Sequence, residues 1–363
     1  MNRSVFGVVA FLMAAAVITS APVTPAQAQA KQTPVEQLYA ELAKLPPAER
    51  AKRIEEGARK EGKLVFVHTW RGKLARDHIA LFRKRYPFIN VDMTDIGSQD
   101  ASERLVAEET AGRHLTDVVS LAVPDLAEIL KADLLANYPT PATENILAQY
   151  KGFLDPDHRW TPWYWSEHGV SYNSSLVKPD QAPKAWKDLC NPAFRGSVSF
   201  DPAETRFMVG LYAIMGEQET ESLLKCIGEN KPIIQRGHTQ RMELMLAGDH
   251  MVQGDNYLYR GIEIQRETPS TPYAIAYTAP VMGYAGVMAI NKNTPHPYAA
   301  ALLSDWSLSK ESQEYTAKNL RGPVGVKHPY LPEETKVVTY GDVAPEIVDR
   351  LQGYWAKYIG RGK

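Results

Sequence analysis

A regular alternation of short apolar strands and amphipathic helices, beginning near residue 63, is the feature that most constrains the fold of this chain. Lys63–His68 is an apolar run of strand length, Asn90–Asp95 is expected to be a second strand, and a helical pattern near Leu74–Tyr86 lies between them. Asp117–Leu121 is expected to be a third short strand. Strands that are apolar along their whole length are typical of sheets buried on both faces. The pattern therefore predicts an α/β sheet covered by helices on each side.

The rest of the chain also contains segments with the patterns of helices and strands. Residues 34–61 have the pattern of two helices that are broken at Pro46-Pro47. Residues 137–168 are rich in Pro, Tyr and Trp and lack helical or strand periodicity. The other expected elements are strands at Gly169–Tyr172, Gly196–Phe200, His250–Gln253, Tyr273–Tyr277 and Gly286–Ile290, and helices at Ala185–Leu189, from about Glu204, near Thr220–Glu229, near Thr239–Ala247, at Tyr298–Leu308 and at Lys310–Asn319.

The first thirty residues have the composition of a cleavable secretory signal peptide. Arg3 precedes the apolar run Val5–Ser20, and two small-x-small sites end at Ala28 and Ala30. The apolar run is shorter than the ~20 residues that a membrane span needs. Because no cysteine stands directly after it, in residues 21–30, we do not expect a lipid anchor. The segment predicts an exported protein that works in the periplasm.

The length and charge of the chain bound its organisation. Without its leader the chain has about 330 residues, more than one core usually serves, so two lobes with a ligand cleft between them are expected. A net charge of −1 argues against a nucleic-acid or polybasic membrane surface. The expected segments are a signal peptide (1–30), an N-terminal helical extension (31–61), a first lobe (62–165 plus about 280–363) and a second lobe (166–279).

The two cysteines of the chain, Cys190 and Cys226, are expected to form a disulfide. An isolated pair in an oxidising compartment is more often bridged than free. Closing a loop of this length stabilises a protein by roughly 3–4 kcal/mol in the chain-entropy model. No Cys-x-x-Cys pattern is present, which argues against a redox role.

Several segments together resemble the extracellular solute-binding proteins of ABC importers, in the branch that includes ferric-iron-binding proteins. The first is H-G-V-S-Y-N-S-S-L-V (His168–Val177), followed by A-P-K-A-W-K-D-L-C-N-P-A-F-R-G-S-V-S-F-D-P (Ala182–Pro202). The second is T-P-H-P-Y-A-A-A-L-L-S-D-W-S-L-S-K-E-S-Q (Thr294–Gln313), with R-G-P-V-G-V (Arg321–Val326) after it. The resemblance implies a two-lobed, type II periplasmic-binding-protein fold, hinged by crossover strands, that presents its cargo to an inner-membrane permease.

The resemblance also suggests ferric iron as cargo, held chiefly by tyrosinates. It places one such tyrosine at Tyr172 and another at Tyr257, in G-D-N-Y-L-Y-R, where the usual second tyrosine is Leu258 and Tyr259 is offset by one residue. His68, with Trp70 and Arg71 after it, offers the only first-lobe histidine near the expected place. In D-V-V-S-L-A-V-P (117–124) only small and apolar residues stand where an acidic ligand is expected, just after the third strand. The chain therefore offers fewer ligands than an iron site of this family usually has.

A small organic anion is the competing ligand. Asp201–Arg206 carries the chain from a strand end into a helix start, where free N–H groups and the helix dipole favour negative charge. Thr205 could add a hydroxyl and Arg206 a bidentate fork. Ser98 lies at the corresponding helix start of the first lobe, and Trp70 could supply an apolar wall. Helix caps and local ion pairs would explain these polar residues equally well.

Three classes of function stay open on the sequence. A binding protein of an importer is the first, a receptor that docks on a membrane kinase or chemoreceptor is the second, and an exported enzyme is the third. The chain lacks the nucleophile-elbow, metalloprotease and nucleotide-binding motifs, so we expect no catalysis. No cofactor is expected beyond Fe³⁺ as possible cargo, and a monomer is expected.

Overall fold

A computed structural model describes residues 32–202, 205–277, 280–341 and 343–360. The predicted leader lies outside these residues. Thr33–Lys363 form one unit that contains both helices and strands. Its α-helices are α1 (Pro34–Leu42), α2 (Pro47–Glu61), α3 (Gly72–Arg85), α4 (Ser98–Thr110), α5 (Ala127–Lys131), α6 (Thr205–Glu229), α7 (His238–Ala247), α8 (Leu258–Glu267), α9 (Pro297–Ser307), α10 (Lys310–Lys318) and α11 (Pro345–Tyr358).

The strands join into one mixed sheet in the order β2-β1-β3-β9-β4-β7-β5-β6, while β8 and β10 pair with β4 and β11 pairs with β9. Strands β1, β2 and β3 run parallel to one another, as do β5, β6 and β7, and the pair β9 and β4 between them is antiparallel. The strands are β1 (Lys63–His68), β2 (Asn90–Asp95), β3 (Val118–Ala122), β4 (Thr161–Asn173), β5 (Val198–Phe200), β6 (Ile233–Ile234), β7 (Val252–Tyr257), β8 (Tyr273–Ala276), β9 (Val281–Ile290), β10 (Gly322–Pro323) and β11 (Val337–Thr339).

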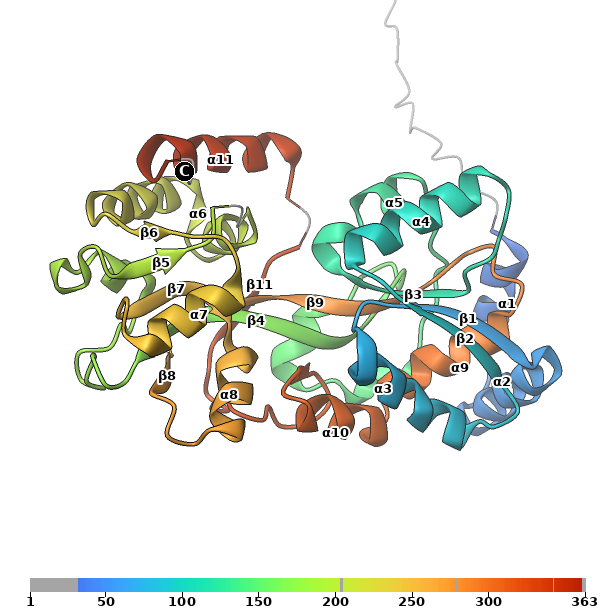
Figure 1. The fold of residues 1–363 in the computed structure, drawn as a ribbon. Coiled ribbons are helices and arrows are strands. Elements are labelled where there is room, and N and C mark those ends of the chain that lie inside the picture. The colour runs from blue at the N-terminus through green and yellow to red at the C-terminus, as the bar shows by residue number, and fades with distance from the viewer. Residues whose placement is uncertain (1–31, 203–204, 278–279, 342, 361–363) are drawn as a thin grey trace, which may run out of the picture. The chain divides into compact units, whose positions relative to one another are not determined.

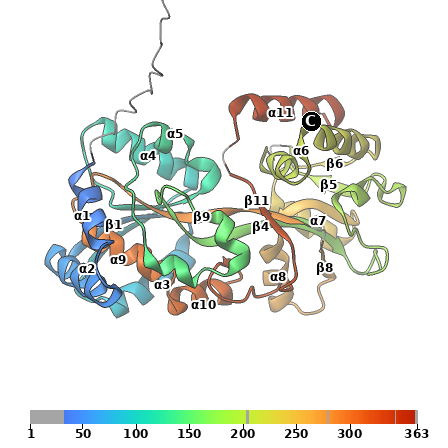
Figure 2. The same cartoon turned by 180° about the vertical axis from the view of Figure 1, so that it is seen from behind.

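Helices cover both faces of this sheet, as the apolar strands predicted. Figures 1 and 2 show α4 and α5 on one face of the β1–β3 part and α2, α3 and α9 on the other. Around β5–β7, α6 and α11 lie on one face and α7 and α8 on the other. The inner strands β3, β4 and β9 are therefore buried along their whole length, whereas the edge strand β2 is only partly buried.

The buried apolar residues fall into two clusters. One is built around Phe66, Trp163 and Trp165 in the β1–β3 part. The other is built around Phe200 and Phe207, and it includes residues of α11 that pack on α6. The lobe boundaries given above stay a prediction. Among the described residues, none of the helices has both the length and the apolar content of a membrane span.

Strand β4 corrects the sequence reading of residues 137–168. The aperiodic stretch ends at Thr161, where a strand of 13 buried residues begins. Its first half pairs with β9 and its second half with β7 and β8. Because β4 is covered on both faces, it shows no polar alternation that could reveal it. Gly286 of β9 lies against the Tyr164 ring, where a Cβ atom would clash.

Many other elements lie close to their predicted positions, but several differ. Strand β9 begins at Val281 rather than Gly286, and α5, β6 and β11 were not predicted. The two helices broken at Pro46-Pro47 are confirmed as α1 and α2. The strand expected at His250–Gln253 is wrong in its bounds, because β7 runs from Val252 to Tyr257. Helix α8, directly after β7, was not predicted, and neither was α11.

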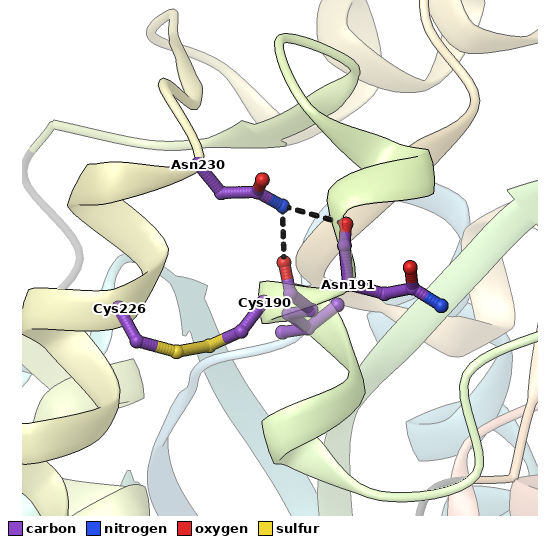
Figure 3. The surroundings of a disulfide bond; sticks show 5 residues. Cys190, Asn191, Cys226 and Asn230 are labelled. Atoms are coloured by element: carbon purple, nitrogen blue, oxygen red, sulfur yellow. Dashed lines mark hydrogen bonds between the residues drawn. A yellow bond between two sulfur atoms is a disulfide. The ribbon is translucent and has the colours of Figure 1, made fainter.

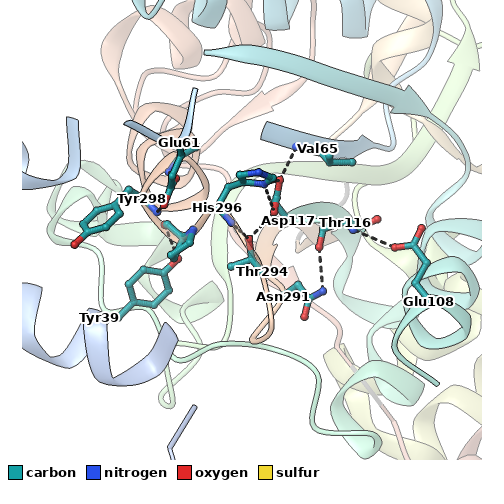
Figure 4. A network of polar contacts seen from close by, with 12 residues as sticks. Tyr39, Glu61, Val65, Glu108, Thr116, Asp117, Asn291, Thr294, His296 and Tyr298 are labelled. Atoms are coloured by element: carbon teal, nitrogen blue, oxygen red, sulfur yellow. Dashed lines mark hydrogen bonds and ion pairs between the residues drawn. The ribbon is translucent and has the colours of Figure 1, made fainter. Parts of the chain in front are cut away.

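A network of hydrogen bonds around the buried Asp117 ties three segments together (Figure 4). The Asp117 carboxylate accepts hydrogen bonds from the backbone N–H of Val65 in β1 at 2.6 Å and from the Thr294 hydroxyl at 2.6 Å. His296 Nδ1 lies 3.0 Å from both carboxylate oxygens. Burial raises the pKa of Asp117, and these partners oppose that shift. The network fixes β3 against β1 and against the segment after β9.

The predicted disulfide between Cys190 and Cys226 is present, with 5.7 Å between the two Cα atoms (Figure 3). It joins the short 3₁₀ turn Trp186–Cys190 to α6. The Asn230 side chain donates hydrogen bonds to the carbonyl oxygens of Leu189 at 3.0 Å and Asn191 at 2.9 Å. The Asn230 side chain is therefore hydrogen-bonded to the backbone on both sides of Cys190.

Replacing Asn230 with alanine is expected to lower the free energy of unfolding by about 1–2 kcal/mol. The substitution leaves the Leu189 carbonyl buried without this donor, and an unpaired buried carbonyl costs roughly that amount. Urea denaturation of the oxidised protein measures the change. An unchanged unfolding free energy would show that the amide contributes nothing to the Cys190 turn.

Candidate functional site

Arg206 brings together residues from four separate elements. Its Nη1 donates a hydrogen bond to the Tyr257 hydroxyl at 3.4 Å, and its Nη2 donates to Asp125 Oδ2 at 3.3 Å. The guanidinium carbon lies 5.0 Å from the centre of the Tyr284 ring. The Tyr257 and Tyr284 hydroxyl oxygens are 3.4 Å apart. We refer to Asp125, Arg206, Tyr257 and Tyr284 as the Arg206 cluster.

The sheet register explains how the two tyrosines meet. Tyr257 ends β7 opposite His168 of β4, and Tyr284 of β9 lies opposite Ser166 of the same strand. Residues two apart on a strand point to the same face. Strand β4 therefore places Tyr257 and Tyr284 on one face, next to the start of α6 that carries Arg206.

The cluster is polar and partly open to solvent. The Arg206 side chain is 34% exposed and that of Asp125 is 17% exposed. Burial lowers the pKa of Arg206, but its interactions with Tyr284, Tyr257 and Asp125 outweigh this and raise the pKa above its usual value. The guanidinium is thus positively charged at every physiological pH.

Behind Tyr257 lies a buried His–Asp pair. The His168 ring meets the Tyr257 ring edge-on, with 4.2 Å between their centres. His168 Nδ1 lies 3.1 Å from Asp255 Oδ1, and both side chains are fully buried. Burial alone would raise the pKa of Asp255, but the charge and hydrogen bond of His168 lower it. The pair keeps the Tyr257 ring against the cluster.

A second guanidinium adjoins the tyrosines. The Arg321 guanidinium carbon lies 3.7 Å from the centre of the Tyr259 ring, and Nη1 donates to Glu263 Oε1 at 3.2 Å. The Tyr259 ring in turn lies 5.9 Å from that of Tyr257. Burial raises the pKa of Tyr259, and the positive charge of Arg321 opposes this rise.

The first-lobe aromatic residues suggested by the sequence lie in the core. His68 is fully buried, its Nε2 lies 3.3 Å from His78 Nδ1, and its Nδ1 accepts the backbone N–H of Trp70 at 3.2 Å. Trp70 is 6% exposed and packs against Trp163, with 4.5 Å between ring centres. Burial lowers the pKa of His68 to about 3. Both residues pack beneath the end of β1.

Arg71, Ser98 and Thr205, which the sequence also suggested, occupy three different places. The exposed Arg71 precedes α3, and its Nη2 lies near Gly97, where a Cβ atom would come within 3.0 Å of it. The Ser98 hydroxyl accepts the backbone N–H of Ala122 at 2.8 Å, and the Thr205 hydroxyl accepts from Gln352 at 3.3 Å.

The two tyrosines proposed as iron ligands have different neighbours. Tyr172 lies on β4 in the second apolar cluster, where burial raises its pKa, and it interacts electrostatically with Tyr277. Tyr257 instead contacts Arg206, His168 and Tyr284. Among the residues that the model describes, no group of three or more His, Cys, Asp or Glu side chains is placed to hold a metal ion.

Three residues near the site were not predicted from the sequence as site residues. Asp125 stands one residue beyond the stretch searched for an acidic ligand, in the short turn after β3. Tyr284 lies inside an apolar strand and Arg321 just before β10, so neither carries a local signal of function. The position of Asp125 directly after a predicted strand was the one usable clue.

The comparisons with known proteins agree with this architecture. Residues 116–341, more than half of the chain, match the family model described as bacterial extracellular solute-binding protein. No curated protein matches the chain.

Solved structures of periplasmic binding proteins share its fold. Iron-bound HitA from Pseudomonas aeruginosa matches with a TM-score of 0.65 at 17% identity, over 82% of this chain and 99% of its own. IdiA (FutA) from Trichodesmium, in complex with iron and citrate, matches with a TM-score of 0.64 at 17% identity, over 83% and 99%. AfuA from Actinobacillus pleuropneumoniae, with fructose-6-phosphate bound, matches with a TM-score of 0.59 at 18% identity, over 82% and 98%.

At sequence identities this low, the solved structures are evidence of the fold alone. Family membership rests on the family model, which covers all four residues of the Arg206 cluster. The predicted type II periplasmic-binding-protein fold is confirmed, and the chain belongs to the bacterial extracellular solute-binding proteins.

Proposed function

We propose that this protein is the substrate-binding component of an ABC importer in the periplasm, which captures a small organic anion at the Arg206 cluster and delivers it to an inner-membrane permease. Family membership supports the binding role, and the predicted leader supports the location. The single observation that carries the ligand class is the partly exposed Arg206 guanidinium beside two tyrosine hydroxyls. Guanidinium groups bind carboxylates and phosphates through charge-assisted hydrogen bonds.

The predicted lobes would close across this cluster. With the boundaries given above, Asp125 belongs to the first lobe and Arg206 to the second, so their 3.3 Å ion pair would connect the two. A ligand bound by Arg206 and Tyr257 of the second lobe would then lie next to Asp125 and Tyr284 of the first. Closure of this kind is how a hinged receptor traps its cargo.

Replacing Arg206 with alanine is expected to weaken anion binding by about 1.5–3 kcal/mol, the contribution of a charge-assisted hydrogen bond. Isothermal titration calorimetry of the leaderless protein with succinate, citrate, inorganic phosphate and glucose 6-phosphate identifies the anion and measures the loss.

Arg350→Ala is the matched control, because Arg350 also forms an ion pair with a carboxylate, that of Glu217, on the exposed α6–α11 surface. It should bind the anion as the unmodified protein does. Failure of all four anions to bind the unmodified protein would refute the proposal, and unchanged affinity in Arg206→Ala would remove Arg206 from the site.

Ferric iron is the second candidate cargo, favoured by the 3.4 Å separation of the Tyr257 and Tyr284 hydroxyls. Two phenolate oxygens at this distance could bind one hard cation. Protein loaded with ferric citrate should then show a visible tyrosinate charge-transfer band that Tyr257→Phe removes. A colourless protein would exclude this cargo.

Sensing is the remaining alternative to transport, since a receptor for a membrane kinase or chemoreceptor would use the same site. A permease or ATPase gene beside this one would favour transport. Conversion of the bound anion to a product during incubation would instead favour an exported enzyme.

A further inference from the structure

We propose that the Arg206 cluster selects a small zwitterion, whose anionic group binds Arg206 and Tyr257 and whose protonated amine binds Asp125. This inference rests on the proposed function and narrows its ligand class. It starts from the charges at the site: the cluster contains one guanidinium and one carboxylate, which face each other at 3.3 Å.

The contact between Arg206 and Asp125 is suited to being opened. It is a single hydrogen bond from Nη2 to Oδ2, longer than a usual charge-assisted contact, and the Arg206 side chain is one-third exposed. The Nη1 of the same guanidinium points to Tyr257 instead. A ligand anion can therefore approach the guanidinium from the tyrosine side and replace Asp125 as its partner.

An anion alone would leave Asp125 without a countercharge. The Asp125 side chain is only 17% exposed, so its carboxylate is largely desolvated. Separating a partly buried ion pair is unfavourable when one member stays unpaired. A ligand that also carries an ammonium group restores the balance, because each end of the ligand meets an opposite charge.

The space next to Asp125 has the electrostatic character that an ammonium group requires. Asp125 borders a groove of about 410 Å³ between α4 and the start of α5. Glu103 and Glu128 also line this groove, and its lining residues include no lysine or arginine. Neither Arg206 nor the two tyrosines belong to the lining of this groove, so Asp125 is the residue that the groove shares with the Arg206 cluster. An ammonium group that binds Asp125 from the groove would therefore meet carboxylates and no competing cation of the lining.

Matched pairs of probes with and without an amine test this polarity. The pairs are β-alanine with propionate, and O-phosphoethanolamine with ethyl phosphate, each titrated by calorimetry into the leaderless protein. We expect the amine-bearing member of a pair to bind at least about tenfold more tightly, because it adds a charge-assisted hydrogen bond.

Two variants assign the two ends of the ligand. Asp125→Asn should abolish the preference for the amine and bind the amine-free anion more tightly than the unmodified protein, because the competing carboxylate is gone. Arg206→Gln should weaken both members of each pair. Glu217→Gln, which removes a carboxylate from the exposed surface of α6, should keep the full preference. Melting temperatures confirm that each variant is folded.

Equal affinity for the two members of each pair would overturn the zwitterion inference and leave the anion receptor intact. The same holds if none of these probes binds while succinate, citrate, phosphate or glucose 6-phosphate does. If no anion of either set binds, the proposed function itself fails. Retention of the amine preference in Asp125→Asn would also overturn the inference, because the ammonium group would then have another partner.

Discussion

The double variant Cys190→Ala/Cys226→Ala is expected to unfold with a free energy about 3–4 kcal/mol below that of the unmodified protein. The disulfide closes a loop of 36 residues in sequence, and the chain-entropy model assigns roughly this stabilisation to a loop of that length. The bridge also holds the Trp186–Cys190 turn on α6, the helix that carries Arg206. Urea denaturation at neutral pH measures the difference.

Reduction provides the internal control for this prediction. A reducing agent should shift the urea midpoint of the unmodified protein towards that of the double variant and leave the double variant itself unchanged. If the oxidised and reduced proteins unfold at the same urea concentration, the bridge constrains neither the folded nor the unfolded chain, and the prediction is wrong.

Acidification from pH 7 to pH 5 is expected to destabilise the protein through its buried histidines. Burial lowers the pKa of His68 to about 3, and burial together with the charge of Arg241 lowers that of His250 to about 4. The pKa of His78 is lowered well below its usual value, by burial and by His68. The folded protein therefore binds fewer protons than the unfolded chain throughout this range.

The sign follows from proton linkage. Each such histidine in the unfolded chain is protonated below about pH 6.5, so stability falls by about 1.4 kcal/mol per pH unit and per histidine below that value. His68 and His250 together then account for a loss of about 4 kcal/mol at pH 5. The burial-raised pKa values of Asp117 and Asp305 act in the opposite direction, and mainly at lower pH.

Urea denaturation at a series of pH values measures this dependence. His250→Gln should reduce the slope by about 1.4 kcal/mol per pH unit, the contribution of one histidine. His158→Asn is the control, because His158 is exposed and asparagine tolerates its φ of 56°. A slope that is the same in His250→Gln and in the unmodified protein would contradict the prediction.

Helices and strands were predictable from the sequence where the hydrophobic pattern of a segment matches the way the segment is buried in the fold. Strands β1 and β2 have the predicted bounds, because each follows a helix with a clear end, at Gly62 before β1 and at Pro87 before β2. Strand β4 was not found in its first half, since aromatic residues buried on both faces produce neither a helical nor an alternating pattern. Helix α8 was missed because it starts at Leu258, with no cap residue between it and β7.

The candidate site was predictable only in part, because its geometry depends on pairing over long distances in sequence. Arg206 and Tyr257 have local signals, a helix start and a tyrosine motif. Tyr284 reaches them through the register of β9 on β4, and Asp125 through the turn after β3. No sequence pattern within one segment predicts that these two residues lie next to Arg206 and Tyr257. His68 shows the opposite error. The sequence suggested it as a site residue because it ends a strand, but it is buried in the core.

Helix α11 is the last element of the chain and completes the packing of α6. Its Leu351 and Trp355 complete the apolar cluster around Phe200 and Phe207, and its Arg350 pairs with Glu217 of α6. These residues follow every strand of the sheet in chain order, so in a chain that is exported N-terminus first, α6 keeps an uncovered apolar surface until they too have crossed the membrane. A partly exported chain in this state is a natural target for chaperones that bind exposed hydrophobic segments.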